Sequence, residues 1–198
     1  MASAIATPPP ARPAANTGGN GLMWIVYGVM LVAAAGAILF FATRDHSASD
    51  VSADLGDGVL FEHPNFGYKI QLPAGFKQVN NLPEPGFVGE VNGKQVTIAT
   101  FGQALGATMF TKKQIETALT QFAEQRGCTI EHSRWRRLAG TNAFAGDGEC
   151  PALSLRYQFA SYKTQRYLAL VTLATAPGDY RRVKSLRKAL FRDRVTIP

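Results

Sequence analysis

The sequence predicts an α+β domain, an antiparallel sheet packed by helices, that follows a single transmembrane helix. Three observations predict this class. Residues 21–43 form an uncharged apolar run, several later segments alternate apolar and polar residues, and two segments place apolar residues on one helical face. The 198 residues leave room for one domain beside a membrane segment. The expected order after the membrane helix is β-β-β-α-β-β-β-β-α.

The chain begins with residues 1–20, which are mainly Ala, Pro, Gly and Asn. Such a segment buries too little surface to offset its ordering entropy, so we expect a disordered tail. The uncharged residues 21–43 are long enough for a membrane span, which needs about 20 apolar residues. A cleaved signal peptide is the alternative, but its apolar core is usually only about 7–15 residues long and follows clustered positive charge. We therefore predict an uncleaved transmembrane helix.

Two observations predict the orientation of this helix. Arg12 and the amino terminus precede the apolar run, whereas Arg44 directly follows it, and positive charge favours the cytoplasmic side. The two cysteines, Cys128 and Cys150, both lie in the C-terminal part, and an even number suits an oxidising compartment. We expect a single-pass protein of the bacterial inner membrane, with a cytoplasmic N-terminus and a periplasmic C-terminal domain.

A polar linker is predicted at residues 44–60, and a folded domain at residues 61–198. Residues 66–73 alternate apolar and polar positions and stop at a proline, which indicates a strand. Asn92-Gly93 separates two further strand-like runs, residues 86–91 and 94–101. This dipeptide favours the two-residue turn of a β-hairpin, because both positions accept positive φ.

A helix is predicted to begin after Thr111. Thr111 is suited to cap the helix, with Gln114 three residues later completing a capping box. Apolar residues then recur with helical spacing on one face, which must pack on the sheet; they are Ile115, Ala118, Leu119, Phe122 and Ala123. Gly127 is the expected C-terminal stop.

Four strands in two hairpins are expected within residues 128–175. A turn at residues 138–141 would bring Cys128 opposite Cys150, within one residue of perfect register. We predict a disulfide between them, with two separate buried thiols as the alternative. The second hairpin would join residues 153–159 to residues 167–173. Asp147-Gly148-Glu149 is interpreted as a turn and not as a calcium site, because it lacks the number of ligands that calcium takes.

The last predicted helix spans residues 180–194, with Asp179 as its cap and Val183, Leu186 and Leu190 as its apolar stripe. Basic residues crowd this helix, and three more, at residues 134, 136 and 137, form a second cluster. One interpretation is a solvated helix face. The other is contact with anionic lipid headgroups or an acidic protein surface. The candidate partner-binding residues are Arg181, Arg182, Lys184, Arg187 and Lys188.

Small residues form a ridge on the predicted membrane helix and would allow another helix to approach closely. They are Gly28, Ala33, Gly36 and Ala37. The alternative is that the ridge faces lipid, since alanine-rich spans are common.

The domain resembles the PsbP-like family. The resemblance is carried by Tyr68-Lys69-Ile70-Gln71-Leu72-Pro73-Ala74-Gly75-Phe76, which is similar to the aromatic-strand-Pro-x-Gly-aromatic opening of that family, with Phe76 where a Trp is common. The order of elements over residues 61–198 supports it. The resemblance implies an α-β-α sandwich and a binding or assembly role without catalysis.

The remaining side chains suggest no reaction chemistry. His46, His63 and His132 have no metal-ligand spacing, and the sequence contains no G-x-S-x-G elbow and no phosphate-binding glycine loop. We expect no enzyme, no cofactor, no metal and no nucleic acid. The function predicted is an accessory or assembly subunit of a membrane or envelope complex, with the complex subunits and the lipid bilayer as partners. The alternative is a small-ligand or cell-wall-binding module.

Overall fold

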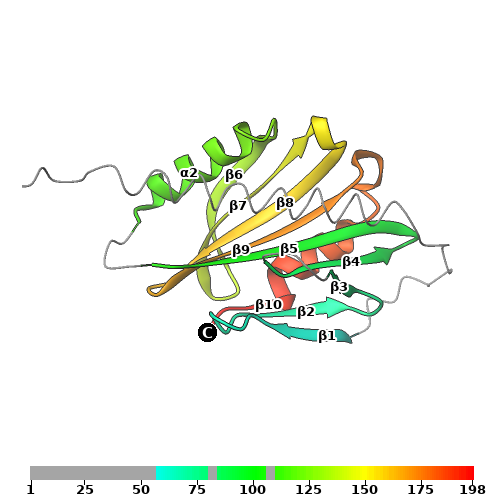
Figure 1. Cartoon of the computed structure of the whole chain (residues 1–198), viewed down its shortest axis with the longest axis horizontal. Coiled ribbons are helices and arrows are strands. Elements are labelled where there is room, and N and C mark those ends of the chain that lie inside the picture. Colours follow the sequence, from blue (N-terminus) through cyan, green and yellow to red (C-terminus); the bar gives the residue numbers. More distant parts are fainter. Residues whose placement is uncertain (1–56, 80–83, 106–109) are drawn as a thin grey trace, which may run out of the picture.

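The computed structural model describes residues 57–79, 84–105 and 110–198 (Figure 1). These ranges contain a seven-stranded sheet, a three-stranded sheet and two α-helices, and all strand pairs are antiparallel. The predicted α+β class is thereby confirmed. The predicted tail and membrane helix, residues 1–43, lie outside the described residues. Within the described ranges, no helix has the length and apolar character needed to span a bilayer.

The large sheet forms the centre of the domain. In sheet order its strands are β3 (Lys77–Val79), β4 (Gly86–Val91), β5 (Lys94–Ala104), β9 (Tyr167–Thr175), β8 (Leu155–Lys163), β7 (Thr141–Cys150) and β6 (Thr129–Leu138). The predicted hairpin at Asn92-Gly93 is confirmed, because both residues have positive φ, 54° and 66°, and Val91 pairs with Lys94. The middle strand β9 is apolar on both faces, as its sequence predicts.

The small sheet corrects the prediction of a single sheet. Its order is β1 (Asp57–Glu62), β2 (Lys69–Pro73) and β10 (Val195–Thr196). β1 starts within the range 44–60 that the sequence assigns to a linker, so the folded domain begins before Phe61. β10 is only two residues long and has no periodicity to detect, and it exists because it pairs with β2.

The helices confirm one prediction and correct another. α2 (Lys112–Glu124) is capped by Thr111, and the capping box with Gln114 is present. The C-terminal helix is not continuous over residues 180–194. It consists of a 3₁₀ turn η2 (Pro177–Asp179), a short α3 (Lys184–Ala189) and a π-helical turn η3 (Leu190–Arg194). The Asp179 carboxylate does not cap α3 and lies 3.4 Å from Lys94 Nζ.

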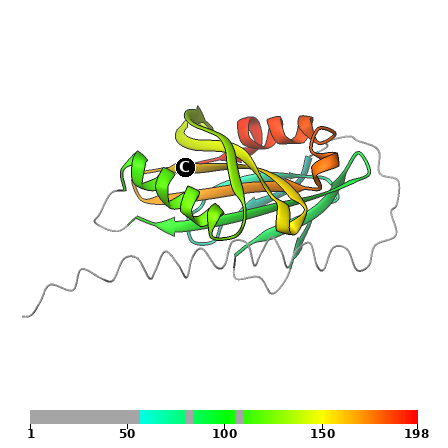
Figure 2. The same ribbon diagram turned by 90° about the horizontal axis from the view of Figure 1, so that it is seen from above.

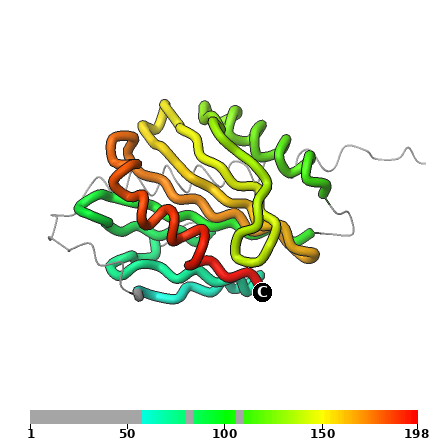
Figure 3. Tube along the Cα trace, turned by 180° about the vertical axis from the view of Figure 1, so that it is seen from behind, coloured from blue at the N-terminus to red at the C-terminus, as the bar shows by residue number. Residues whose placement is uncertain are grey.

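Elements cover both faces of the large sheet. On β9, Val171 and Leu173 face a core that contains Leu186, Leu190 and the β2 residue Ile70. The alternate residues of β9 face α2. α3, η3 and the small sheet therefore share one layer, in which they lie side by side (Figure 3). α2 lies apart from α3, near the other end of the long strands (Figure 2).

The disulfide between Cys128 and Cys150 is confirmed, with a Cα–Cα distance of 4.0 Å. A regular hairpin with the predicted turn would leave the two cysteines one residue out of register. A β-bulge between Ile130 and His132 adds one residue to β6 and corrects this offset. The bulge lies opposite glycines: a Cβ on Gly148 would stand 1.9 Å from the Thr129 carbonyl oxygen. The disulfide joins the start of β6 to the end of β7 beneath Ala123 of α2.

Replacing both cysteines by serine should lower the free energy of unfolding by about 3 kcal/mol, because the unfolded chain is no longer closed into a loop. Urea unfolding, followed by intrinsic fluorescence, measures this change. Reduction of the unaltered protein serves as the control and should produce a similar loss. Equal stability of the oxidised and reduced proteins would contradict the prediction.

Candidate docking surface

The predicted basic residues of the C-terminal segment divide into two groups. Val183, Leu186 and Leu190 each have an exposed fraction of 0% and face the large sheet. Most polar residues before and between these positions are exposed. Four cations are exposed in this way and are named the basic surface from here on: Arg181, Arg182, Lys184 and Lys188.

The charge of the basic surface is not neutralised within the described part of the chain. None of its four residues forms an ion pair with a described residue. Asp179 is the acidic residue nearest in sequence, and its carboxylate contacts Lys94. Four like charges are thus held close together on a short segment. These charges repel one another, and their combined potential attracts anionic groups.

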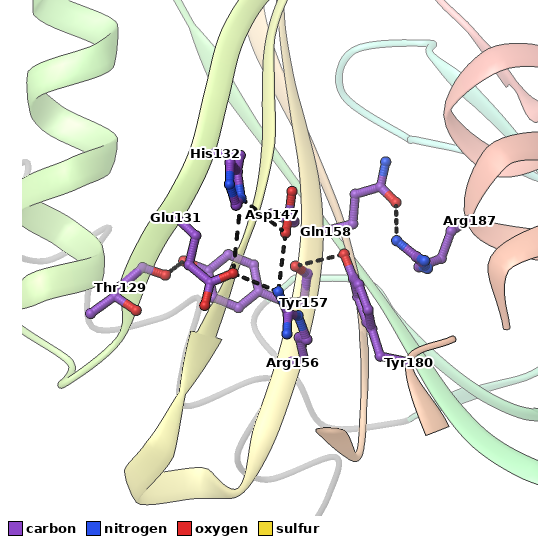
Figure 4. A network of polar contacts seen from close by, with 9 residues as sticks. All are labelled: Thr129, Glu131, His132, Asp147, Arg156, Tyr157, Gln158, Tyr180 and Arg187. Carbon is purple, nitrogen blue, oxygen red and sulfur yellow. Dashed lines mark hydrogen bonds and ion pairs between the residues drawn. The ribbon is translucent and has the colours of Figure 1, made fainter. Parts of the chain in front are cut away.

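Arg187, the fifth predicted residue, is half-buried and turned toward the sheet. Its guanidinium carbon lies 3.6 Å from the centre of the Tyr180 ring, and its Nη1 donates to Gln158 Oε1 at 3.2 Å (Figure 4). The guanidinium of Arg156 lies 5.0 Å from the same ring. Both contacts are cation–π interactions, so Arg187 positions the helical segment on β8 and is not available to a partner.

A polar network around Arg156 fastens this segment to the strands. Arg156 Nη2 lies 2.5 Å from Glu131 Oε2 and 3.6 Å from Asp147 Oδ2. Glu131 is the extra residue of the bulge in β6. Consecutive residues of a regular strand point to opposite faces, and the bulge removes that restriction. As a result, Glu131 reaches Arg156 while His132 Nδ1 lies 3.8 Å from Asp147 Oδ2 (Figure 4).

The same network includes two tyrosines. The Tyr157 hydroxyl donates to the Thr129 carbonyl at 3.1 Å, and the Tyr180 hydroxyl donates to the Tyr157 carbonyl at 3.5 Å. Burial, with a further contribution from Asp147 and Glu131, raises the pKa of Tyr157 to about 12. Burial also raises the pKa of Tyr180. Both hydroxyls therefore stay protonated at neutral pH and serve as hydrogen-bond donors.

Glu131, His132 and Asp147 also offer three ligand atoms within 4.8 Å of one another. Arg156 already contacts both carboxylates, and the His132 side chain is 79% exposed. The three side chains belong to an ion-pair network with Arg156.

The second predicted basic cluster, on β6, is divided by strand alternation. Arg134 is exposed and Arg136 is half-buried. Trp135, between them, points to the opposite face and donates from Nε1 to the Glu116 carboxylate of α2. Arg137 is exposed, and its Nε donates to the Gly140 carbonyl at 3.1 Å. These arginines therefore do not form one surface.

An apolar cavity of about 90 Å³ lies between α2 and the sheet. Leu119, Phe122 and Leu170 are among its lining residues, together with both cysteines. Ligand pockets usually have roughly 300–1,000 Å³ and a few convergent polar groups. The lining side chains with polar atoms besides the cysteines are Tyr157, whose hydroxyl is already bonded to Thr129, and Thr172. The cavity therefore gives no support to the small-ligand alternative.

Sequence reasoning missed the residues that orient the basic surface. Tyr180, Arg156 and Glu131 lie in different elements, and only the register of β6, β7 and β8 brings the last two together. Asp147-Gly148-Glu149 is part of β7 rather than a turn. The ridge at Gly28, Ala33, Gly36 and Ala37 lies outside the described residues, so helix packing there stays a prediction.

Replacing Arg187 by methionine should lower the free energy of unfolding by about 1–3 kcal/mol, because the cation–π contact and the bond to Gln158 are lost. The matched control is Lys188→Met on the exposed side, which should change it by less than about 0.5 kcal/mol. Urea unfolding compares the two variants. Equal effects would show that Arg187 does not hold the segment in place.

Comparisons with known proteins bear on the fold. No family model matches the sequence, and no curated protein matches it. A solved structure that resembles it is the cyanobacterial PsbP protein CyanoP from Synechocystis, at 13% identity and a TM-score of 0.52, over 72% of this chain and 94% of that one.

Two further solved structures align with lower TM-scores. A protein of unknown function from Pseudomonas aeruginosa aligns at 13% identity and a TM-score of 0.47, over 72% of this chain and 99% of that chain. LpqN, a protein involved in cell envelope biogenesis of Mycobacterium tuberculosis, aligns at 12% identity and a TM-score of 0.48, over 71% of this chain and 90% of that chain. The likeness to CyanoP concerns the fold alone, and on that ground the domain has the PsbP-like fold that the sequence predicts.

Proposed function

We propose that this chain is a non-catalytic accessory or assembly subunit of a membrane complex, held at the membrane by residues 21–43. Its folded domain docks on an anionic partner through the basic surface. One observation carries this proposal: four exposed cations lie on the outer side of a segment whose inner side is fully buried, and no described residue pairs with them.

The energetics of the basic surface support docking over a purely structural role. Unpaired like charges lower the stability of the folded domain through mutual repulsion. A partner of opposite charge removes this repulsion and speeds association. The Arg187–Tyr180 stack and the buried apolar side hold the segment firmly, so the cations are pre-organised and little ordering entropy is lost on binding.

The other polar groups support a role without catalysis. The carboxylates of Glu131 and Asp147 are engaged by Arg156. The raised pKa of Tyr157, about 12, keeps its hydroxyl protonated. A general base must be free to accept a proton from a substrate, whereas both carboxylates already contact a guanidinium.

The disulfide supports placing the domain outside the cytoplasm. Disulfides persist in oxidising compartments such as the bacterial periplasm and are rare in the cytosol. Cys128–Cys150 joins the only two cysteines of the chain. We therefore propose a periplasmic domain on a single-pass inner-membrane protein.

Purification from native membranes in mild detergent tests the proposed function. The unaltered chain should recover a stoichiometric set of membrane partners. A variant in which all four residues of the basic surface are replaced by glutamine should recover these partners at least about tenfold less, since each lost charge pair weakens binding by roughly 1 kcal/mol or more.

The matched control removes the same charge from exposed positions elsewhere, at Lys77, Lys112, Lys113 and Arg166. This variant should keep the partners. A solitary monomer recovered with the unaltered chain would contradict the accessory function.

A further inference from the structure

Strand β1 of the small sheet carries two neighbouring apolar side chains that are exposed. Val59 and Leu60 are 65% and 55% exposed, and they are the large apolar side chains that the described residues leave exposed. Both lie on β1, the edge strand of its sheet. Exposed apolar edge strands favour association and are usually covered or blocked by charge.

Strand register explains why Leu60 points outward. Leu60 pairs with Gln71, and Phe61 pairs with Ile70. Ile70 has an exposed fraction of 0%, and the Phe61 ring lies 4.9 Å from that of Phe87. Since neighbouring residues of a strand point to opposite sides, Leu60 points away from the core.

The apolar pair and the basic surface lie on elements of one layer of the molecule. The small sheet and the C-terminal helical segment form a single layer over the large sheet (Figure 3). Arg194 Nη1 donates to the Gln71 carbonyl at 3.5 Å, and Gln71 Nε2 donates to the Gly58 carbonyl at 2.9 Å. These contacts connect the helical segment, through β2, to the strand that carries Val59 and Leu60.

Two acidic residues in this layer, Glu62 and Asp193, have cationic neighbours. Glu62 Oε2 lies 3.1 Å from Lys69 Nζ, and Asp193 Oδ1 lies 3.6 Å from Arg192 Nε. They therefore subtract little from the positive charge of the basic surface.

We propose that this face lies against an anionic lipid bilayer. The basic surface contacts phosphate headgroups, and Val59 and Leu60 enter the interfacial region. The inference rests on the proposed function, because it names the partner of the same basic surface. Cations beside apolar side chains are the pattern of proteins that lie on a membrane surface, where the apolar groups sink below the headgroups.

The length of the chain before β1 supports a bilayer as the occupant. Residues 44–56 connect the predicted span to β1 and can reach at most about 45 Å when fully extended. The domain is therefore confined near the membrane at a high effective concentration. Under that condition, a few headgroup contacts and two apolar side chains suffice for docking.

A fluorescent probe at Leu60 tests the inference in the full chain. Both native cysteines are joined in the disulfide, so Leu60→Cys places a single thiol for an environment-sensitive label. The labelled protein is reconstituted into nanodiscs of phosphatidylcholine alone or with phosphatidylglycerol. Phosphatidylglycerol should shift the emission to the blue, and high salt should reverse the shift.

Two comparisons sharpen the test. Adding the four glutamine substitutions should abolish the shift, because each cation near an anionic surface favours docking roughly fivefold. A label at Thr117→Cys, on the exposed side of α2, should not respond to lipid composition.

Absence of a shift with phosphatidylglycerol, or an equal shift in both lipids, would overturn the inference. If partners were still recovered from native membranes in a manner that depends on the basic surface, the anionic partner would be a protein and the accessory function would stand. If neither the emission shift nor the recovery of partners were observed, both the inference and the proposed function would be wrong.

Discussion

Burial of one face of the seven-stranded sheet is the constraint on which the rest of this domain depends. Val171 and Leu173 of the central strand need an apolar cover, and the cover comes from two sources far apart in the sequence. The small sheet contributes Ile70, and the C-terminal segment contributes Leu186 and Leu190. Because the apolar stripe of that segment must face the sheet, the four cations of the basic surface face outward, while Arg187 contacts Tyr180 and Gln158. The basic surface is therefore a consequence of hydrophobic burial and not a separate feature.

Charge on the C-terminal segment and on the adjacent strands serves two purposes. Arg156 and Arg187 are used internally, where both guanidinium groups stack on Tyr180. The one-residue bulge at Glu131 makes this possible, since it turns a carboxylate toward Arg156 that a regular strand would place elsewhere. The four cations that are not used internally stay exposed. A count of basic residues cannot separate the two groups, whereas the contacts of each side chain within the domain can.

The opposite face of the sheet is filled less completely. A cavity of about 90 Å³ remains under α2, and Leu119 and Phe122 are only half-buried there. Packing defects of this kind reduce the stability gained from burial. The Cys128–Cys150 disulfide lies at this weaker position and ties the strands on which the end of α2 rests. The covalent bond thus compensates where apolar packing is incomplete.

Local chemistry in the sequence determined the Asn92-Gly93 turn, the Thr111 capping box and the pairing of the cysteines to within one residue, because each depends on residues close in the chain or on a single hairpin. Only the tertiary structure decided the small sheet, since β10 is two residues long and gains its hydrogen bonds from β2. The inward direction of Arg187 and the outward direction of Leu60 were also decided there. The direction of a side chain depends on what its element packs against, and those contacts join residues more than a hundred positions apart, as Gln71 and Arg194 show.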